Sequence, residues 1–560
     1  MKQPLESERH QGEATRRDFL KGIAALGAGI VGSASLAACS PSGNDASKIP
    51  TTGADGAWDE ETDVVIVGGG GTGWAAAWAA ADAGSSVIVF EKSEMGGGNT
   101  GLSGGMMLAA GTETQKEKGI EDDAEKFAEE QLAYGMGWVD EDLVRKICSR
   151  SAEMISWMEG FGQIYDVLDP IPSLKPYSNE SNWAKRCHWH YDALNPESYQ
   201  ESYGGTHVAR IREAAEKMGV RCEMKAEVTH LVTDDELGVI GVTVEMKNDE
   251  IRVKAKKGVV LAAAGIDNDP ELARSLNKQQ LWGLQCVDLG QGSNNSMPSN
   301  TGDGIRMGME IGAALNLSPA CVMQPPVGLG GVHDYPALYY GKENPQLYGG
   351  TANAGIIAVN RYGRRFMQED AMWTYICGMV FEEAVNTGCV PPKEGEHCAW
   401  QICDADHVFQ TLYSFGGDEE EAVSSGLLVR ADSIEGLAEA IGIDPEPLKD
   451  TVDRWNDLSA RGEDPDFGRK ADFGAIAKAP FYAASLDRPI VMGTAGGLKV
   501  NADCEVVDIH GEVIPHLFAG GMNAGGWIGK FYHACGWAVT GTAVTGRTCG
   551  ENAAKQEAWS

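Results

Sequence analysis

The sequence lacks any excess of positive charge. Lys and Arg number 46 against 81 Asp and Glu, which gives a formal net charge of -35. A surface of this sign repels the phosphate backbone of nucleic acids, so nucleic acid is not expected as a partner. Small neutral molecules and basic protein surfaces remain as plausible partners.

Cysteine motifs are also missing. None of the 13 cysteines belongs to a CxxC pair, and no CxxCH is present, which excludes a covalent haem. Cys377, Cys389, Cys398 and Cys403 lie close together in sequence and leave two interpretations open, ligands of an iron-sulfur cluster or buried free thiols. Their spacing matches no known cluster motif, so free thiols are favoured.

No metal site is expected either. His188 and His190 have a spacing that could place two ligands on one face of a strand, but no Glu or Cys is placed to complete a ligand set. We therefore expect surface or packing histidines.

No apolar run is long enough for a comfortable membrane span. The apolar, small-residue stretch from Gly22 to Ala38 follows Arg16 and Arg17 and has the length of a signal sequence. It predicts export by the twin-arginine route, with residues 1–39 as the signal and Cys39 as a lipidated N-terminus. Cleavage nearby without a lipid is the alternative. Residues 40–57 are rich in Ser, Pro, Gly and Asp, which is typical of a flexible tether. We expect an extracytoplasmic protein that touches the cell membrane only through its lipid.

A strand-loop-helix-strand unit lies between Asp63 and Glu91. The apolar runs at 64–67 and 87–90 predict two buried parallel strands, and the Ala-rich segment 74–83 predicts the helix between them.

The loop of this unit has GxGxxG spacing at Gly68, Gly70 and Gly73. These glycines serve a tight turn, close approach of a pyrophosphate, and close packing of helix on strand. The pyrophosphate would lie at the N-terminus of the helix. Glu91 is placed to accept hydrogen bonds from the adenosine ribose. By itself, the unit does not distinguish NAD from FAD.

Further strands are predicted at 258–265 and at 517–521, the second followed by a small-residue helix that reaches Lys555. The alternating pattern of 238–254 predicts an antiparallel layer that covers the sheet. We assign residues 58–320 and 493–560 to a discontinuous cofactor-binding domain, and residues 321–492 to an inserted domain.

Five further motifs occur in the same order in one flavoprotein family. They are Gly97–Thr100, Ser103–Gly105, Thr301–Ile305, Asn360–Phe366 and Gly493–Gly497. From roughly 62 to 555, the chain resembles the fumarate reductase and 3-ketosteroid dehydrogenase flavoproteins. The resemblance implies FAD, a Rossmann-like α/β FAD-binding domain, and an α+β capping domain whose interface with it holds the substrate.

The glycine motif and the resemblance together imply a set of FAD-binding residues. They are Gly68, Gly70, Gly73, Glu91, Lys92, Gly98, Asn99, Thr100, Ser103, Gly104, Gly105, Val228, Gly265, Asp303, Gly521 and Asn523.

The chain departs from the fumarate branch at three positions. Gly493 replaces a histidine, no arginine follows Arg365 and Phe366 within the next few residues, and Tyr532 stands where that branch has a second arginine. Each departure removes a cation or donor for a dicarboxylate, which argues against fumarate as the substrate.

The ketosteroid branch fits better, because its C-terminal motif is matched by Gly529, Tyr532 and Gly536. In that branch the tyrosine hydroxyl and the second glycine's N–H hold the substrate ketone, an arrangement that stabilises an enolate. The branch also uses a tyrosine for proton exchange at carbon. Tyr375 is the candidate, although Trp373 stands at the aligned position.

Some neighbouring residues keep two interpretations. His533 could tune Tyr532 or relay protons, or it could simply pack. Tyr339, Tyr340 and Tyr348 could form an aromatic wall for a polycyclic substrate, or pack a loop.

We therefore expect an FAD-dependent oxidoreductase that acts on the CH–CH group and reduces a C=C bond conjugated to the carbonyl of a neutral, possibly steroid-like enone. Its electrons would come from an external cytochrome or quinone-linked partner, as in anaerobic respiration. One alternative is a 3-ketosteroid dehydrogenase working oxidatively. Others are a reductase of fumarate-, urocanate- or cinnamate-like carboxylates that uses Lys530 as its cation, and a flavin electron-transfer lipoprotein without substrate chemistry.

Overall fold

The computed structural model describes residues 56–168, 184–192, 204–247, 249–324, 355–369, 373–408, 419–426, 428–469, 473–532, 534 and 536–559. All of them belong to one unit, residues 49–560. The predicted export signal and nearly all of the tether lie outside the described residues. So do His533, Tyr339, Tyr340 and Tyr348.

An eight-stranded sheet carries the N-terminal and C-terminal parts of the chain. Its order is β19-β20-β9-β1-β2-β6, with β8 paired to β9 and β7 paired to β8. The strands are β1 Glu60–Val67, β2 Val87–Glu91, β6 Arg221–Met224, β7 Ala226–Asp234, β8 Gly238–Met246, β9 Asp249–Leu261, β19 Glu505–Val507 and β20 Val513–Ala519. From β20 to β6 all neighbours are parallel. Such a sheet is covered on both faces, which explains the continuous apolar runs of its strands.

The predicted strand-helix-strand unit is confirmed. Residues 64–67 of β1 pair in parallel with 87–90 of β2 on one side and with 258–261 of β9 on the other. Helix α2, Gly71–Asp82, connects the two strands.

The alternating segment 238–254 differs from the prediction of a separate layer. Strand β9 runs without a break from Asp249 to Leu261, so its first half pairs with β8 and its second half lies in the parallel core. No glycine or proline interrupts 249–257. The antiparallel pair β8 and β9 therefore extends the main sheet instead of covering it.

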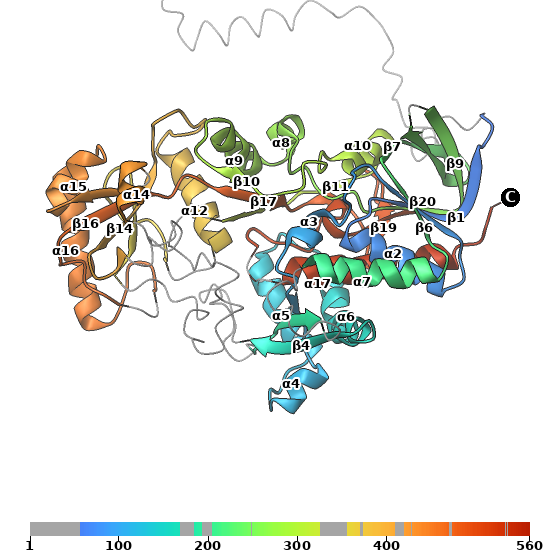
Figure 1. Ribbon diagram of the computed structural model, residues 1–560, viewed down its shortest axis with the longest axis horizontal. Coiled ribbons are helices and arrows are strands. Elements are labelled where there is room, and N and C mark those ends of the chain that lie inside the picture. Colours follow the sequence, from blue (N-terminus) through green and yellow to red (C-terminus); the bar gives the residue numbers. More distant parts are fainter. Residues whose placement is uncertain are drawn as a thin grey trace, which may run out of the picture. The chain divides into compact units, whose positions relative to one another are not determined.

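Helix α17, Trp537–Lys555, packs on α2, and α7, Gly204–Lys217, also contacts α2 (Figure 1). Two glycines of α17 make this close approach possible. A Cβ at Gly546 would lie 2.5 Å from the carbonyl oxygen of Thr72, and one at Gly550 would lie 2.1 Å from that of Ala76. Helices α2 and α17, which lie near the two ends of the described chain, thus pack backbone against backbone.

Other helices and short strands surround this sheet. They are α3 Gly98–Leu102, α4 Glu113–Glu117, α5 Ala124–Gly135, α6 Glu141–Glu159, α8 Pro270–Leu276, α9 Lys278–Asp288, α10 Asp303–Glu310, β3 Met107–Leu108, β4 Gln163–Leu168, β5 Cys187–Asp192, β11 Leu315–Asn316, β18 Gly497–Leu498 and the 3-10 helix η5 Gly521–Asn523. Strands β3, β5 and β4 form one small sheet, and β11 pairs with β18.

The inserted part is built on a four-stranded antiparallel sheet of order β13-β14-β16-β15. Its elements are β13 Ile357–Asn360, α12 Trp373–Asn386, β14 Ala399–Asp404, α14 Glu419–Ser424, β15 Val429–Ala431, α15 Ile434–Ala440, α16 Pro445–Arg461 and β16 Phe481–Ser485. Alternate residues of β13 pack into two different hydrophobic cores. Ile357 and Val359 belong to one core, and Ala358 belongs to the other. The sheet is thus packed on both faces.

A second small sheet, of order β10-β17-β12, joins the two parts of the chain. It consists of β10 Ser293–Asn294, β12 Cys321–Gln324 and β17 Ile490–Thr494. Strand β12 leads into the inserted part and β17 leads out of it, and the two pair antiparallel.

A buried ion cluster fixes α5 to the small β-sheet. Arg186 donates to Asp122 at 2.6 Å and also pairs with Glu130. Burial raises the pKa of Glu130 to about 7, against the opposing attraction of Arg186. One arginine therefore faces two carboxyl groups, one of which takes up a proton near neutral pH.

Within the described ranges, no helix is both long enough and apolar enough to cross a membrane.

Candidate active site

A cavity of about 540 Å³ opens where parallel strands of the main sheet end. Val67 ends β1, Glu91 ends β2 and Ala262 follows β9, and all three line it. Ligands of open parallel sheets bind outside the carboxyl ends of the strands. The position is that of a cofactor site.

The glycine loop between β1 and α2 forms one wall. Gly68 has a φ of +103°, and a Cβ there would lie 2.6 Å from the carbonyl oxygen of Ala262. A Cβ at Gly73 would lie 1.9 Å from the carbonyl oxygen of Gly68. The first glycine thus makes the turn and the third allows helix α2 to pack on the strand, as the spacing predicts.

Gly70 differs from the other two. A Cβ at this position would meet no atom nearer than Cα of Gly98, at 3.8 Å. Packing within the described chain therefore does not explain the glycine. A ligand that approaches the backbone at the N-terminus of α2 does, and the loop fits the pyrophosphate of a dinucleotide.

Glu91 and Lys92 line the cavity at the end of β2. The Glu91 carboxylate accepts from the N–H of Gly69 at 2.7 Å and from that of Ser93 at 2.8 Å. These bonds hold the acid in the loop, and each oxygen keeps a lone pair for a ribose hydroxyl. Lys92 donates to Thr301 at 2.6 Å and to Asp303 at 2.5 Å, which connects β2 to the start of α10.

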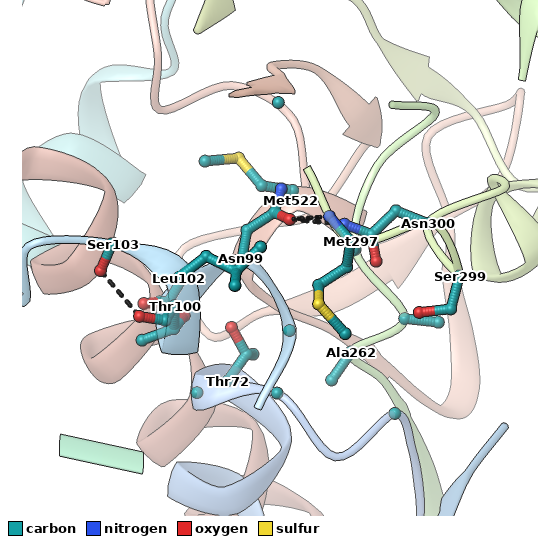
Figure 2. A pocket seen from close by; sticks show the side chains of 18 of the residues that line it. Thr72, Asn99, Thr100, Leu102, Ser103, Ala262, Met297, Ser299, Asn300 and Met522 are labelled. Atoms are coloured by element: carbon teal, nitrogen blue, oxygen red, sulfur yellow. Dashed lines mark hydrogen bonds between the residues drawn. The ribbon is translucent and has the colours of Figure 1, made fainter. Parts of the chain in front are cut away.

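Asn99, in α3 beside the glycine loop, joins three segments of the chain (Figure 2). Its side-chain oxygen accepts from the N–H of Met297 at 2.9 Å and from the side-chain amide of Asn300 at 3.0 Å. Its own amide donates to Asp267 at 2.7 Å and to the carbonyl of Met492 at 3.0 Å. Both hydrogen-bonding ends of Asn99 are thus occupied by the protein.

Asp267, which the sequence interpretation missed, is the acceptor at the centre of this network. It is 1% exposed and also accepts from Asn300 at 2.7 Å and from the N–H and hydroxyl of Thr494 at 2.8 and 2.7 Å. Burial raises the pKa of its carboxyl above the usual value, although these donors act in the opposite direction. Its sequence signal is an acid two residues beyond the small-residue turn at Gly265.

Tyr532 and Gly536 both line the cavity at the start of α17. The Tyr532 side chain is buried, and its hydroxyl accepts from the N–H of Ala538 at 3.1 Å. Gly536 is the N-cap of α17 with a φ of +98°, and a Cβ there would lie 2.9 Å from the carbonyl carbon of Met107. The structure therefore brings the two proposed carbonyl-binding groups to one helix N-terminus.

Charge is confined to one end of the cavity. Among the described lining residues only Glu91, Lys92, Glu227 and Asp303 are charged, and Lys92 lies 4.0 Å from Glu227 and 2.5 Å from Asp303. Glu91 is the neighbour of Lys92 in the chain. The remaining described lining is neutral, including Tyr532 and the small, apolar and amide side chains.

Most of the other predicted cofactor residues line the same cavity. They are Gly98, Thr100, Ser103, Gly104, Gly105 and Val228.

Four predicted cofactor residues are not among the lining residues: Gly73, which packs α2 on its strand, and Gly265, Gly521 and Asn523. A Cβ at Gly265 would lie 2.3 Å from the Thr494 hydroxyl, and one at Gly521 would lie 2.2 Å from that of Thr72. Asn523 accepts from the N–H of Ala263 at 2.6 Å and donates to the carbonyl of Ala264 at 2.6 Å. The last three hold the segment after β9 against the C-terminal turn.

Tyr375 is also not among the lining residues. It lies in the first turn of α12, and its ring packs edge-on against Phe531 with 5.1 Å between centroids. Phe531 directly precedes Tyr532 in the chain, so Tyr375 contacts the neighbour of Tyr532. The role of Tyr375 in proton exchange stays a prediction.

Lys530, the cation considered for a carboxylate substrate, is paired elsewhere. Its Nζ lies 2.6 Å from Glu382 of α12 and 5.0 Å from the centre of the Phe531 ring. Lys530 is not among the residues found to line the cavity. It ties the inserted part to the segment before Tyr532.

His188 and His190 are buried, so of the two expected roles packing is the one observed. His188 contacts Thr112 and the carbonyl of Arg186, each at 2.8 Å, and burial lowers its pKa to about 4. Cys377, Cys389, Cys398 and Cys403 are buried free thiols. The described residues contain no group of three or more His, Cys, Asp or Glu side chains suited to a metal ion.

Comparison with known proteins adds a family to this geometry. The model of the family "FAD binding domain" matches residues 63–539. The chain is 38% identical over 563 residues to the digoxin reductase of Eggerthella lenta, covering 97% of both chains. It is 30% identical over 517 residues to the urocanate reductase of the same organism, covering 88% of this chain and 75% of the relative.

Among solved structures, the chain is similar to a 3-ketosteroid-Δ4-(5α)-dehydrogenase of Rhodococcus jostii in complex with 4-androstene-3,17-dione. The TM-score is 0.70 at 26% identity, with 91% of this chain and all of that chain covered. A flavocytochrome c3 fumarate reductase in its open conformation matches with a TM-score of 0.60 at 25% identity, covering 98% of this chain and 83% of the other.

Proposed function

Because this chain belongs to the FAD-binding-domain family, as an FAD-dependent oxidoreductase related to reductases and dehydrogenases that act on carbon-carbon bonds, we propose that it reduces the C=C bond of a neutral, steroid-like enone.

The charge distribution of the cavity carries this proposal. Lys92 is the only cation among the described lining residues, and Asp303 and Glu227 already surround it. A carboxylate substrate taken out of water needs a paired cation, whereas an enone carbonyl needs only hydrogen-bond donors. The neutral lining around Tyr532 therefore favours a ketone over a dicarboxylate.

FAD held by the glycine loop and Glu91 would supply a hydride to the β carbon of an enone. The Tyr532 hydroxyl and the Gly536 N–H hold the carbonyl oxygen and stabilise the negative charge that develops on it. Because both groups lie at the N-terminus of α17, the helix dipole adds to this stabilisation. Burial of Tyr532 keeps water from competing for the oxygen.

A proton must then reach the α carbon. We assign this step to Tyr375, whose ring contacts Phe531 beside Tyr532. The assignment predicts that Tyr375→Phe slows turnover more at high pH, where solvent protons are scarce.

Anaerobic reoxidation of the flavin tests the function. The purified, FAD-loaded protein is reduced with dithionite and mixed in turn with 4-androstene-3,17-dione, cinnamate, urocanate and fumarate while the flavin absorbance is followed. We expect rapid reoxidation by the enone and little by the three carboxylates. Reoxidation by a carboxylate but not by the enone refutes the proposal, and reoxidation by none favours an electron carrier.

The opposite direction is supported by the similarity to a ketosteroid dehydrogenase. The same groups would then stabilise the enolate formed from a saturated ketone. Mixing the oxidised protein with a saturated 3-ketosteroid distinguishes the two directions. Only in a dehydrogenase does the saturated ketone bleach the oxidised flavin faster than the enone reoxidises the reduced flavin.

We further propose twin-arginine export, lipid attachment at Cys39 and an external cytochrome or quinone-linked electron donor. Arg16, Arg17 and Cys39 support the first two, and the absence of a CxxCH motif supports the third. Labelling cells with a palmitate analogue and comparing the wild type with Cys39→Ser tests the lipid. Equal labelling of both proteins refutes it.

A further inference from the structure

Asp267 lies directly behind the wall of the cavity. Its side chain is 1% exposed and is not among the lining residues. Two of the residues that donate to it, Asn99 and Asn300, do line the cavity (Figure 2). Gly493 lines it as well, and a Cβ at Gly493 would lie 3.9 Å from both carboxylate oxygens of Asp267. One layer of residues therefore separates the carboxylate from the cavity.

The hydrogen bonds of Asp267 identify its charge state. One oxygen accepts from the N–H and hydroxyl of Thr494 at 2.8 and 2.7 Å, and the other accepts from Asn99 and Asn300, each at 2.7 Å. The N–H of Met297 donates to the side-chain oxygen of Asn99, which turns the amide nitrogen of Asn99 toward the carboxylate. An ionised carboxyl group has about four acceptor sites, and four donors fill them here. Burial opposes ionisation, but a proton on either oxygen would displace a donor, so the group is held as the anion.

The described part of the chain places no cation against this anion. All four hydrogen bonds to Asp267 come from neutral groups. Cations of adjoining segments are paired with other acids, Lys92 with Asp303 at 2.5 Å and Arg306 with Asp269. Because solvent and salt screen a buried charge only weakly, the field of Asp267 extends into the cavity.

We propose that Asp267 is a positioning residue whose unpaired negative charge lowers the reduction potential of bound FAD. Two electrons enter the flavin ring on reduction, and the ring gains a net negative charge when one proton follows them. A fixed anion behind the cavity wall disfavours that added charge and makes reduced FAD a stronger hydride donor. This effect requires only bound FAD, so it holds whether the substrate is an enone or a carboxylate.

The expected size of the effect follows from Coulomb's law. Two unit charges roughly 10 Å apart, at an effective dielectric constant of about 20, change an equilibrium constant by about tenfold. For a two-electron couple, a tenfold change corresponds to about 30 mV. We therefore expect Asp267→Asn to raise the potential of bound FAD by about 30 mV.

The first experiment measures this potential directly. The FAD-loaded wild type, Asp267→Asn and Asp267→Glu are each equilibrated without oxygen with a redox dye of known potential, and the absorbance of flavin and dye is followed. Asp267→Asn should show the rise, and Asp267→Glu, which keeps the charge, should stay close to the wild type. An unchanged potential in Asp267→Asn, or an equal rise in both variants, overturns the proposal.

Thr494→Val is the matched control for the hydrogen-bond network. It deletes one of the four hydrogen bonds to Asp267 and keeps the charge and the size of the side chain. Its thermal unfolding should show a loss of stability, because a buried donor is removed from a carboxylate. Its flavin potential should stay close to that of the wild type. A rise as large as that of Asp267→Asn would mean that local shape sets the potential, and would refute the role of the charge.

A second variant tests the charge with Asp267 in place, and so does not depend on the folding of an Asp267 variant. Asn300→His puts an imidazole donor beside the same carboxylate oxygen, and this donor becomes a cation when it is protonated. The flavin potential of Asn300→His should rise relative to the wild type as the pH falls through the histidine titration. A difference that does not change with pH contradicts the proposal. Failure of the enone to reoxidise the reduced protein would leave these potentials unaffected, so this proposal and the proposed function fail separately.

Discussion

Removal of one oxygen atom tests the proposed carbonyl site most directly. Tyr532→Phe keeps the buried ring and deletes the hydroxyl that lies at the N-terminus of α17. In other enzymes, loss of one donor to a developing oxyanion slows the reaction by about 10² to 10³, or about 2.7 to 4 kcal/mol. We expect a loss of this size in the rate of flavin reoxidation by the enone.

The same change has a smaller structural effect that must be measured separately. The N–H of Ala538 loses its acceptor at 3.1 Å, at a position where a helix N–H has no partner in the preceding turn. An unpaired buried group costs about 1 to 3 kcal/mol in free energy of unfolding. FAD content and thermal unfolding of the variant therefore accompany the stopped-flow measurement.

Tyr482→Phe provides the matched control. Tyr482 is a buried tyrosine of β16 whose hydroxyl donates to Glu419 at 3.0 Å, and it is not among the described cavity residues. It should lose stability without a change in reoxidation rate. If Tyr532→Phe reoxidises within about threefold of the wild type with FAD bound, against the loss expected for an oxyanion donor, the carbonyl-holding role is wrong.

Three further predictions use other contacts. Gly70→Ala should weaken FAD binding with little effect on the melting temperature of the apoprotein. Gly73→Ala should destabilise the apoprotein itself, because its Cβ would lie 1.9 Å from a carbonyl oxygen. Fluorescence titration measures the loss of FAD binding, and calorimetry measures the loss of stability. Lys530→Met breaks a partly exposed ion pair with Glu382 worth at most about 1 kcal/mol, so rates with enone and with carboxylates should both stay unchanged, and a selective loss with carboxylates would revive the carboxylate alternative. The pKa of Glu130 in the folded protein, about 7, lies above its value in the unfolded chain. Between the two pKa values the folded protein therefore binds one proton more than the unfolded chain at this residue, and the free energy of unfolding falls as the pH rises. The melting temperature of the wild type relative to Glu130→Gln should therefore fall from pH 5 to pH 7.5, and a constant difference would contradict the raised pKa.

Local patterns predicted the elements that depend on neighbouring residues. The glycine spacing at 68–73 predicted the turn and the packing of α2, because a side chain at Gly68 would meet Ala262 beyond the next strand and one at Gly73 would meet Gly68 five residues earlier. The apolar runs of β1, β2 and β20 predicted buried strands. The continuity of β9 was missed, because alternation in its first half and a continuous apolar run in its second half look like separate elements.

Long-range pairing was the part that sequence could not supply. Asp267 meets Asn99 across 168 positions and Thr494 across 227, and no local pattern indicates which distant donors a buried acid will find. Tyr375 shows the same limit, since its position in the chain does not reveal that its ring faces Phe531. Lys530 was a reasonable cation by position, and only the fold shows its partner Glu382.

The placement of β20 and α17 has a consequence for how the protein is made. The ribosome delivers the glycine loop of residues 68–73 early, yet the strand beside β9 and the helix beside α2 come from the last fifty or so residues. Until those residues emerge, the edge of β9 and the glycine-matched face of α2 lack their neighbours, and Tyr532 and Gly536 do not yet exist. Flavin retention is thus a readout of a chain that includes β20 and α17, and a ribosome that stops before Val513 should release a protein without colour.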